Sequence, residues 1–112
     1  MKPAIAQSVL SRANGHCEAC GGQFGLFEWT PEIDHFFSRA RADETEETLW
    51  VLHRACHRDK TDGKPSAGEW LKLFLEHCAR HGYRSSYERA FKRLGIVEAR
   101  EKFAKASLGE GA

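Results

Sequence analysis

The sequence predicts a small, mostly helical α+β domain, and three observations support this. The chain has 112 residues, which is enough for one modest hydrophobic core but not for two. Apolar residues recur at helical spacing near the N-terminus and through the C-terminal half, and two short strand-like runs lie between these regions. Hydrophobic residues make up 41% and charged residues 29%, which is ordinary for a globular protein and excludes collagen-like, coiled-coil-only and fully disordered chains.

The N-terminal half is expected to contain one helix, two strands and the start of a second helix. Residues 3–13 carry apolar side chains at helical spacing and are followed by Asn-Gly, a helix stop signal. The segments 27–35 and 49–52 are apolar enough for strands, with a polar loop over 36–48 between them. Residues 53–59 are predicted to form the start of a helix, which ends before Gly63 and Pro65.

Two Ser-x-x-Glu patterns predict helix starts in the C-terminal part of the chain. The first spans 66–69, and its helix is expected to end at Gly82. The second spans 85–88 and opens a helix that Gly95 is expected to end. A last helix over 96–106 and a frayed tail over 107–112 complete the prediction.

Charge and hydropathy limit the classes of function. The formal net charge is +1, so any binding to a polyanion must come from a local basic patch or from a partner. No apolar run approaches the roughly 20 residues of a membrane helix. Gln7 and Ser8 interrupt the N-terminal apolar stretch, which makes it a poor signal peptide. We therefore expect a soluble, cytoplasmic protein.

Two pairs of metal-ligating side chains are the clearest motif. Cys17 and Cys20 are separated by two residues, as are His53 and Cys56, and 32 residues lie between the pairs. Each pair can present two ligands from one turn, and two such turns complete a tetrahedral Cys₃His zinc site. His16 and His57 compete with His53 for the fourth position. The alternatives are separate buried thiols or disulfides, and the latter fit poorly because nothing indicates secretion.

Cys78 and its neighbouring histidines are expected to have no such role. Cys78 shares a helix face with Leu71 and Phe74, so it is interpreted as a small buried hydrophobic residue. His77 and His81 are four residues apart and could share a metal, but no cysteine or carboxylate joins them on that face. A solvated helix face is the favoured interpretation.

A second group of polar residues lies where the expected strands meet the following helix. Asp34 and His35 end the first strand, and His57 follows the second. A carboxylate and an imidazole can bind a divalent cation while a second imidazole acts as a base, which is the chemistry that phosphodiester hydrolysis needs. Adjacent strand residues point to opposite faces, so Asp34 and His35 can cooperate only if the strand ends there. The residues from Phe36 onward indicate that it does.

In this order, Cys17-x-x-Cys20, Ile33-Asp34-His35 and the segment 49–61 resemble HNH endonucleases that carry a zinc-ribbon-type support. The resemblance covers residues 17–61. It implies a ββα-metal core, meaning a two-stranded antiparallel hairpin followed by a helix, stabilised by a structural zinc and flanked by helices. It also implies a single nuclease domain over 1–112, with its core at 16–64 and a helical extension at 66–106.

The resemblance also implies a role for each matching residue. Asp34 and His57 would bind the catalytic Mg²⁺ or Mn²⁺, or another divalent transition metal, and His35 would be the general base. The four zinc ligands named above would be structural. Thr48 stands where the family usually has an Asn that bonds across the loop and helps to orient the base. A hydroxyl can replace only part of that bonding, so this departure bears on catalytic efficiency.

Basic residues near the expected site are candidates for phosphate binding, although a solvated charged surface is the alternative. They are Arg39, Arg41, Arg54, Arg58, Lys60 and Lys64.

The leading hypothesis is a metal-dependent DNA endonuclease, either nicking or cutting both strands. By resemblance it belongs to a phage, a mobile element or a restriction system in a bacterium or an infected host. Besides DNA, its partner would be a second copy of the chain, in a homodimer, or a packaging or restriction protein. Thr48 motivates the alternative of a weak or inactive, zinc-stabilised nucleic-acid-binding module. A third hypothesis is a metal sensor or assembly protein that never contacts nucleic acid.

Overall fold

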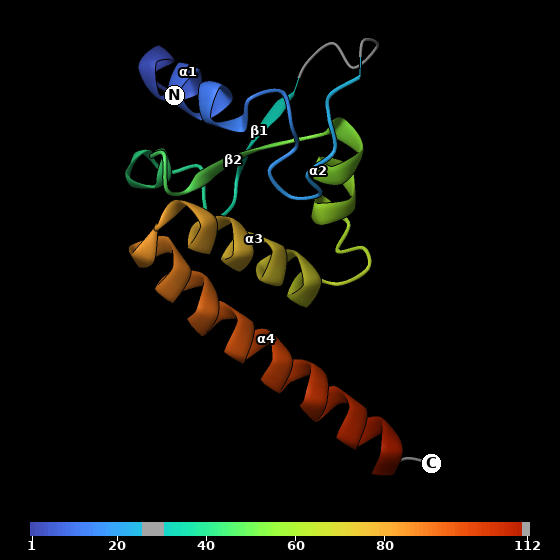
Figure 1. Cartoon of the computed structure of the whole chain (residues 1–112). Helices are drawn as coiled ribbons and strands as arrows, with labels where there is room; N and C mark the ends of the chain where they lie inside the picture. The colour runs from blue at the N-terminus through green and yellow to red at the C-terminus, as the bar shows by residue number, and fades with distance from the viewer. Residues whose placement is uncertain (26–30, 111–112) are drawn as a thin grey trace. The chain divides into compact units, whose positions relative to one another are not determined.

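The computed structural model describes residues 1–25 and 31–110, with side chains up to residue 104. Within this part the protein is a mostly helical α+β structure, with four α-helices and one two-stranded antiparallel hairpin (Figure 1). The predicted fold class is therefore confirmed at this level. Phe27 and Trp29 of the first expected strand lie outside the described residues. The chain divides into two compact units, Met1–Lys64 and Pro65–Ala112.

The first helix of the N-terminal unit, α1, spans Pro3–Ala13, as predicted. Proline suits the first position of a helix, because an N–H group there has no partner within the helix and proline has none to leave unpaired. The helix ends where Asn14 adopts a left-handed conformation with φ 48°. Its inner face buries Val9 and Ala13.

The hairpin consists of β1, Glu32–His35, and β2, Leu49–Leu52. Their antiparallel register places Glu32 opposite Leu52 and His35 opposite Leu49. All four residues of β2 are buried, so this strand is covered on both faces. The core of the unit joins β2 to α1 and consists of Val9, Ala13, Leu49 and Val51, with Ile5, Phe24 and Ile33 packed around them.

The loop between the strands contains one short 3₁₀ helix, η1, over Arg41–Asp43. After β2 the chain enters α2, Arg54–Thr61, which contacts both strands. This helix starts one residue later and ends two residues later than the interval predicted from the sequence. The chain therefore runs strand, strand, helix over residues 32–61, with His53 as the N-cap of the helix.

The C-terminal unit is a pair of packed helices, of which α3, Ala67–His81, follows the prediction. The Ser66 hydroxyl accepts a hydrogen bond from the Glu69 N–H at 3.1 Å, which confirms the first capping pattern. Gly82 ends the helix in a left-handed conformation with φ 71°. Cys78 is 1% exposed, so it is the buried small residue that the sequence predicted.

The prediction for His77 was wrong, because its side chain is fully buried rather than solvated. It follows Trp70 and Phe74 at the helical spacing i, i+4, i+7 and so shares their apolar face. Its ring lies 5.7 Å from the ring of Phe74 and 4.8 Å from that of His81. His81 is exposed, as predicted.

The last helix also differs from the prediction. A single helix, α4, spans Arg84–Glu110, so Gly95 does not end a helix and the expected tail is helical up to residue 110. Glycine inside a helix costs only about 1 kcal/mol relative to alanine, and the buried Ala90 and Leu94 sustain the helix up to that point. Ser85 lies inside the first turn rather than at the N-cap, since Tyr87 already donates to the Tyr83 carbonyl.

The described residues include no helix that is long and apolar enough to cross a membrane.

Candidate metal centre and adjoining histidine site

The turn after α1 has the backbone of a metal-binding knuckle. The Cys17 N–H donates to the Gly22 carbonyl at 2.8 Å, and the Gly21 N–H donates to the Cys17 carbonyl at 2.9 Å. Gly21 has φ 76°, a conformation that glycine adopts without strain. The Gly22 N–H points at the Cys20 sulfur, 3.4 Å away. This turn carries both cysteine sulfurs into one cluster.

The four predicted ligands come together. One ligand atom from each of Cys17, Cys20, His53 and Cys56 lies within 4.8 Å of every other. The His53 Nδ1 atom is 3.3 Å from the Cys20 sulfur and 3.8 Å from the Cys56 sulfur. A tetrahedral zinc ion places its sulfur and nitrogen ligands about 3.6 Å apart. The cluster therefore fits a structural zinc site of Cys₃His composition.

The orientation of His53 is fixed from the opposite side of its ring. Its Nε2 atom lies 3.0 Å from the Gln23 carbonyl, which selects the tautomer that carries a proton on Nε2 and leaves Nδ1 free to bind a metal. The edge of the ring meets Phe24 with centroids 5.0 Å apart. The competing histidines are engaged elsewhere, since His16 contacts the Asn14 carbonyl and His57 contacts Asp34.

The thiols of this cluster differ in pKa. Burial alone would raise the pKa of Cys17, but hydrogen bonds, the strongest from the Cys20 backbone and then that of His53, outweigh it and lower the pKa. Burial, and next the neighbouring Cys17 and Cys20 thiolates, raises the pKa of Cys56 to about 12. A divalent cation would remove this conflict because it stabilises all the thiolates at once.

A buried ion pair connects the knuckle to the rest of the unit. The Arg12 guanidinium donates to both carboxylate oxygens of Glu18, at 2.7 and 2.8 Å. One of these oxygens also accepts the Val51 N–H at 3.0 Å, while the Glu18 N–H donates to the Val51 carbonyl at 2.7 Å. Arg12 reaches the Leu49 carbonyl as well, so α1, the knuckle and β2 share one network. This ion pair was not predicted from the sequence.

A second polar cluster lies where β1 meets α2. His57 Nε2 is 3.1 Å from Asp34 Oδ1, and its Nδ1 is 3.1 Å from Glu32 Oε1. The structure thus brings together two of the predicted site residues and adds Glu32. The sequence contained a signal for Glu32, because residues two apart on a strand lie on the same face as each other. Glu32 therefore had to share the face of Asp34.

Asp34 is 4% exposed and has further partners. The Trp50 indole N–H donates to its Oδ2 at 2.8 Å, and the Lys60 ammonium lies 3.0 Å from the same oxygen. Two cis ligands of an octahedral Mg²⁺ lie about 3.0 Å apart, which is close to the distance between Asp34 Oδ1 and His57 Nε2. The distance alone is equally that of an ordinary hydrogen bond between an imidazole and a carboxylate.

His35 contacts a different residue from its strand neighbour Asp34. Its Nε2 atom lies 3.1 Å from Glu44 Oε2, in the loop between the strands. This hydrogen bond lowers the pKa of the Glu44 carboxyl, outweighing desolvation, and the Met1 amine 3.5 Å away contributes further. β1 ends at His35, as predicted, but His35 is still paired with Leu49 in the ladder, where adjacent residues point to opposite faces. Its partner Glu44 differs from the partners of Asp34 and His57, so these contacts do not bring His35 together with that pair.

Thr48 is buried and ties the same loop together. Its hydroxyl donates to the Asp43 carbonyl and accepts the Thr45 N–H at 3.0 Å.

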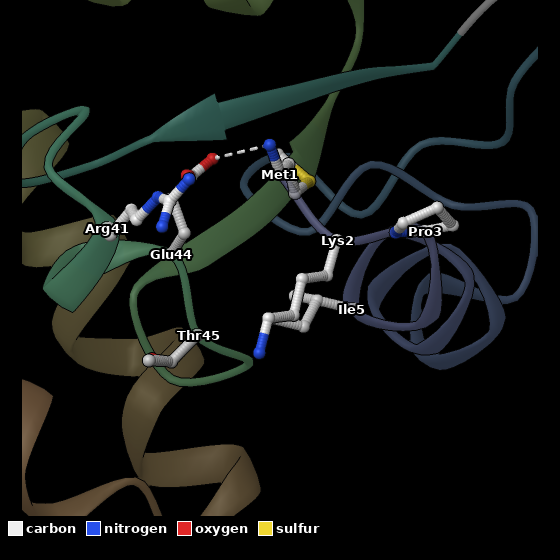
Figure 2. A pocket seen from close by; sticks show the side chains of 7 residues that line it. All are labelled: Met1, Lys2, Pro3, Ile5, Arg41, Glu44 and Thr45. Carbon is white, nitrogen blue, oxygen red and sulfur yellow. Dashed lines mark ion pairs between the residues drawn. The ribbon is translucent and has the colours of Figure 1, made fainter.

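The six basic candidates fall into different environments. Arg54 and Arg58 are exposed on α2 and line a pocket of about 240 Å³ together with Glu32 and His57. Lys60 is held by Asp34 and lies over the Phe36 ring, with its nitrogen 5.3 Å from the centroid. The remaining three, Arg39, Arg41 and Lys64, are exposed. Arg41 lines a second pocket of about 660 Å³ beside Glu44 (Figure 2).

Comparison with known proteins identifies no relative: no family model, no curated protein and no solved structure matches the chain.

Proposed function

We propose that this protein is a metal-dependent endonuclease of the HNH type that hydrolyses phosphodiester bonds in DNA. The observation that carries the proposal is the convergence of Asp34 and His57, with 3.1 Å between Oδ1 and Nε2, on a segment that runs strand, strand, helix. This order and these residues resemble the ββα-metal core. A Cys₃His cluster beside the hairpin supports the same proposal, because it fits the structural zinc that the resemblance implies.

The residues of the chain would divide the chemistry among them. Asp34 and His57 would hold Mg²⁺ or Mn²⁺, which supplies charge stabilisation for the phosphate and the leaving oxygen. Glu32 would keep the proton of His57 on Nδ1 and direct the Nε2 lone pair toward the ion. Arg54 and Arg58 line the pocket beside His57 and would bind the phosphate oxygens of the DNA backbone.

His35 would remove a proton from a water molecule. The oxygen of that water forms the new bond to phosphorus, and the bond to the 3′-oxygen breaks. The leaving oxygen takes a proton from solvent, which gives 5′-phosphate and 3′-hydroxyl ends. A general base of this kind accelerates hydrolysis by about 10²–10⁴-fold.

Nicking of supercoiled plasmid by the zinc-loaded protein tests the proposal. Nicking should require added Mn²⁺ or Mg²⁺ and should fall at least 100-fold in His35→Ala and in His57→Ala. His81→Ala is the matched control, since it removes an exposed histidine of the other unit. Metal dependence should be measured in magnesium-free buffer, because chelation would also strip zinc. Nicking at full rate in His35→Ala would contradict the proposed base.

One observation favours a second candidate, a zinc-stabilised nucleic-acid-binding module without catalysis. The Lys60 ammonium lies 3.0 Å from Asp34, and a cation at Asp34 would have to displace or repel it. Such a module would shift DNA in a gel at low salt equally well with and without Mn²⁺ and would leave plasmid intact. Lys60→Met separates the two candidates, because it should increase metal-dependent nicking only if Asp34 is a metal ligand.

A further inference from the structure

The contact between His35 and Glu44 is a feature that neither the resemblance nor the proposed roles account for. The two side chains are 18% and 16% exposed, and His35 Nε2 lies 3.1 Å from Glu44 Oε2. They are nine residues apart in the chain. A largely buried carboxylate that accepts an imidazole N–H fixes both the tautomer and the ring orientation of a histidine.

The loop that carries Glu44 is itself held in place from β2. Thr48 is 8% exposed, and its hydroxyl donates to the carbonyl of Asp43 and accepts the N–H of Thr45, at 3.0 Å for the latter. These two residues flank Glu44 on either side. The Thr48 hydroxyl therefore fixes the backbone on both sides of Glu44, the residue that contacts His35.

We propose that Glu44 is the positioning residue of His35 and that Thr48 acts through it by holding the loop 43–45. This inference rests on the proposed function, in which His35 is the base. Thr48 stands at the position where the resembling family has a residue that helps to orient the base. In this chain a two-step connection, from Thr48 through the loop to Glu44, would perform that orientation.

The chemistry of the imidazole gives the arrangement its consequence. When Nε2 carries the proton that Glu44 accepts, Nδ1 has the free lone pair. Nδ1 is then the atom that takes the proton from water. Without Glu44 the ring can rotate and populate both neutral tautomers, so only part of the population would present a basic nitrogen to the substrate.

Other groups also face Glu44. The Met1 amine lies 3.5 Å from the same carboxylate oxygen, as the dashed line in Figure 2 shows, and Lys2 and Arg41 line the same pocket. Substitutions of Glu44 must therefore be compared with a substitution that changes the charge of the loop without touching His35.

Histidine tautomers measured by NMR test the proposal without requiring cleavage. In zinc-loaded full-length protein with ¹⁵N-labelled histidine, long-range ¹H–¹⁵N correlations at pH 8 should show His35 protonated on Nε2. The signal is assigned by its loss in His35→Gln. Glu44→Ala should give a mixture of tautomers, whereas Glu44→Gln should keep the Nε2–H form because its amide oxygen still accepts. Glu47→Ala removes a carboxylate of the same loop and should leave the tautomer unchanged.

Kinetics provide the second readout. Glu44→Ala should lower the kcat of plasmid nicking by about 10–100-fold with little change in KM, and Glu44→Gln should restore most of it. Thr48→Val should produce the same tautomer mixture, and adding it to Glu44→Ala should lower kcat no further.

An unchanged His35 tautomer in Glu44→Ala would overturn the proposal, as would an equal loss of kcat in Glu47→Ala. If the wild-type protein does not nick DNA, the proposed function fails, and the tautomer result still decides whether Glu44 orients His35.

Discussion

Gly22 offers a sharp test of the metal centre, because it lies against two of the proposed ligands. A Cβ atom at this position would lie 3.2 Å from His53 Cε1 and 3.4 Å from the Cys20 sulfur. Gly22 is not among the described glycines with positive φ, so alanine is compatible with its backbone and acts through space alone. To relieve the contact, the imidazole must move by a few tenths of an ångström, which exceeds the roughly 0.2 Å tolerance of metal–ligand distances.

We expect Gly22→Ala to weaken zinc binding about 10–100-fold, which corresponds to about 1.4–2.8 kcal/mol. Gly25→Ala is the matched control, because a Cβ at that position meets nothing within 4 Å. Zinc affinity is measured by competition with a chromogenic chelator, and cobalt substitution reports whether the site remains tetrahedral. Equal zinc affinity in the two variants would count against the proposed site, because the alanine Cβ would press on His53 and on the Cys20 sulfur, two of its four proposed ligands.

Three further predictions concern the N-terminal unit, and the last uses Cys78 of the C-terminal unit as a control. Glu18→Ala should lower the free energy of unfolding by about 3–5 kcal/mol, because it leaves the largely buried guanidinium of Arg12 without its carboxylate partner. Urea titration of the zinc-loaded protein measures this change, and a loss below about 1 kcal/mol would contradict the prediction. Since the pKa of Cys56 is raised to about 12, this thiol is protonated at neutral pH and zinc must displace its proton. Zinc affinity should therefore rise about tenfold per pH unit between about pH 6 and 8 from this thiol alone, and calorimetry in two buffers should detect the released proton; pH-independent affinity would argue against Cys56 as a ligand. Cys17→Ser should abolish the thiolate-to-cobalt absorption band or reduce it strongly, whereas Cys78→Ser should retain it, and loss of the band in both would point to a different ligand set.

Local signals explain why several elements could be predicted from the sequence. The Ser66 cap and the Gly82 stop of α3 are decided by bonds within a few residues, and both are confirmed. Gly95 carried the same kind of signal, and the prediction from it was wrong, because packing around Ala90 and Leu94 outweighs the small local cost of glycine. The prediction that His77 lies on a solvated face was wrong. It followed the polar residue type of His77, although the three-residue spacing from Phe74 indicated the buried face of α3.

The metal ligands could be predicted because pairs with fixed spacing are a property of the chain itself. Two residues between Cys17 and Cys20 force both sulfurs onto one turn, whatever the rest of the protein does. The choice of His53 over His16 depended on which turn comes near the knuckle. Spacing favoured His53, and in the structure the Nδ1 atom of His53 lies 3.3 Å from the Cys20 sulfur.

The sequence by itself determined the helix start at Ser66 and the buried strand 49–52, and it indicated the four residues of the Cys₃His cluster, since each is encoded by neighbours in the chain. Only the tertiary structure decided what lies around the histidines. Glu32 meets His57 across 25 residues and Glu44 meets His35 across the loop. The network of Arg12 and Glu18 ties α1 and the knuckle, which are neighbours in the sequence, to Leu49 and Val51 of β2, which lie more than 30 residues further on. Contacts of this kind depend on how strands and helices pack, and no local pattern of residues specifies a partner that distant.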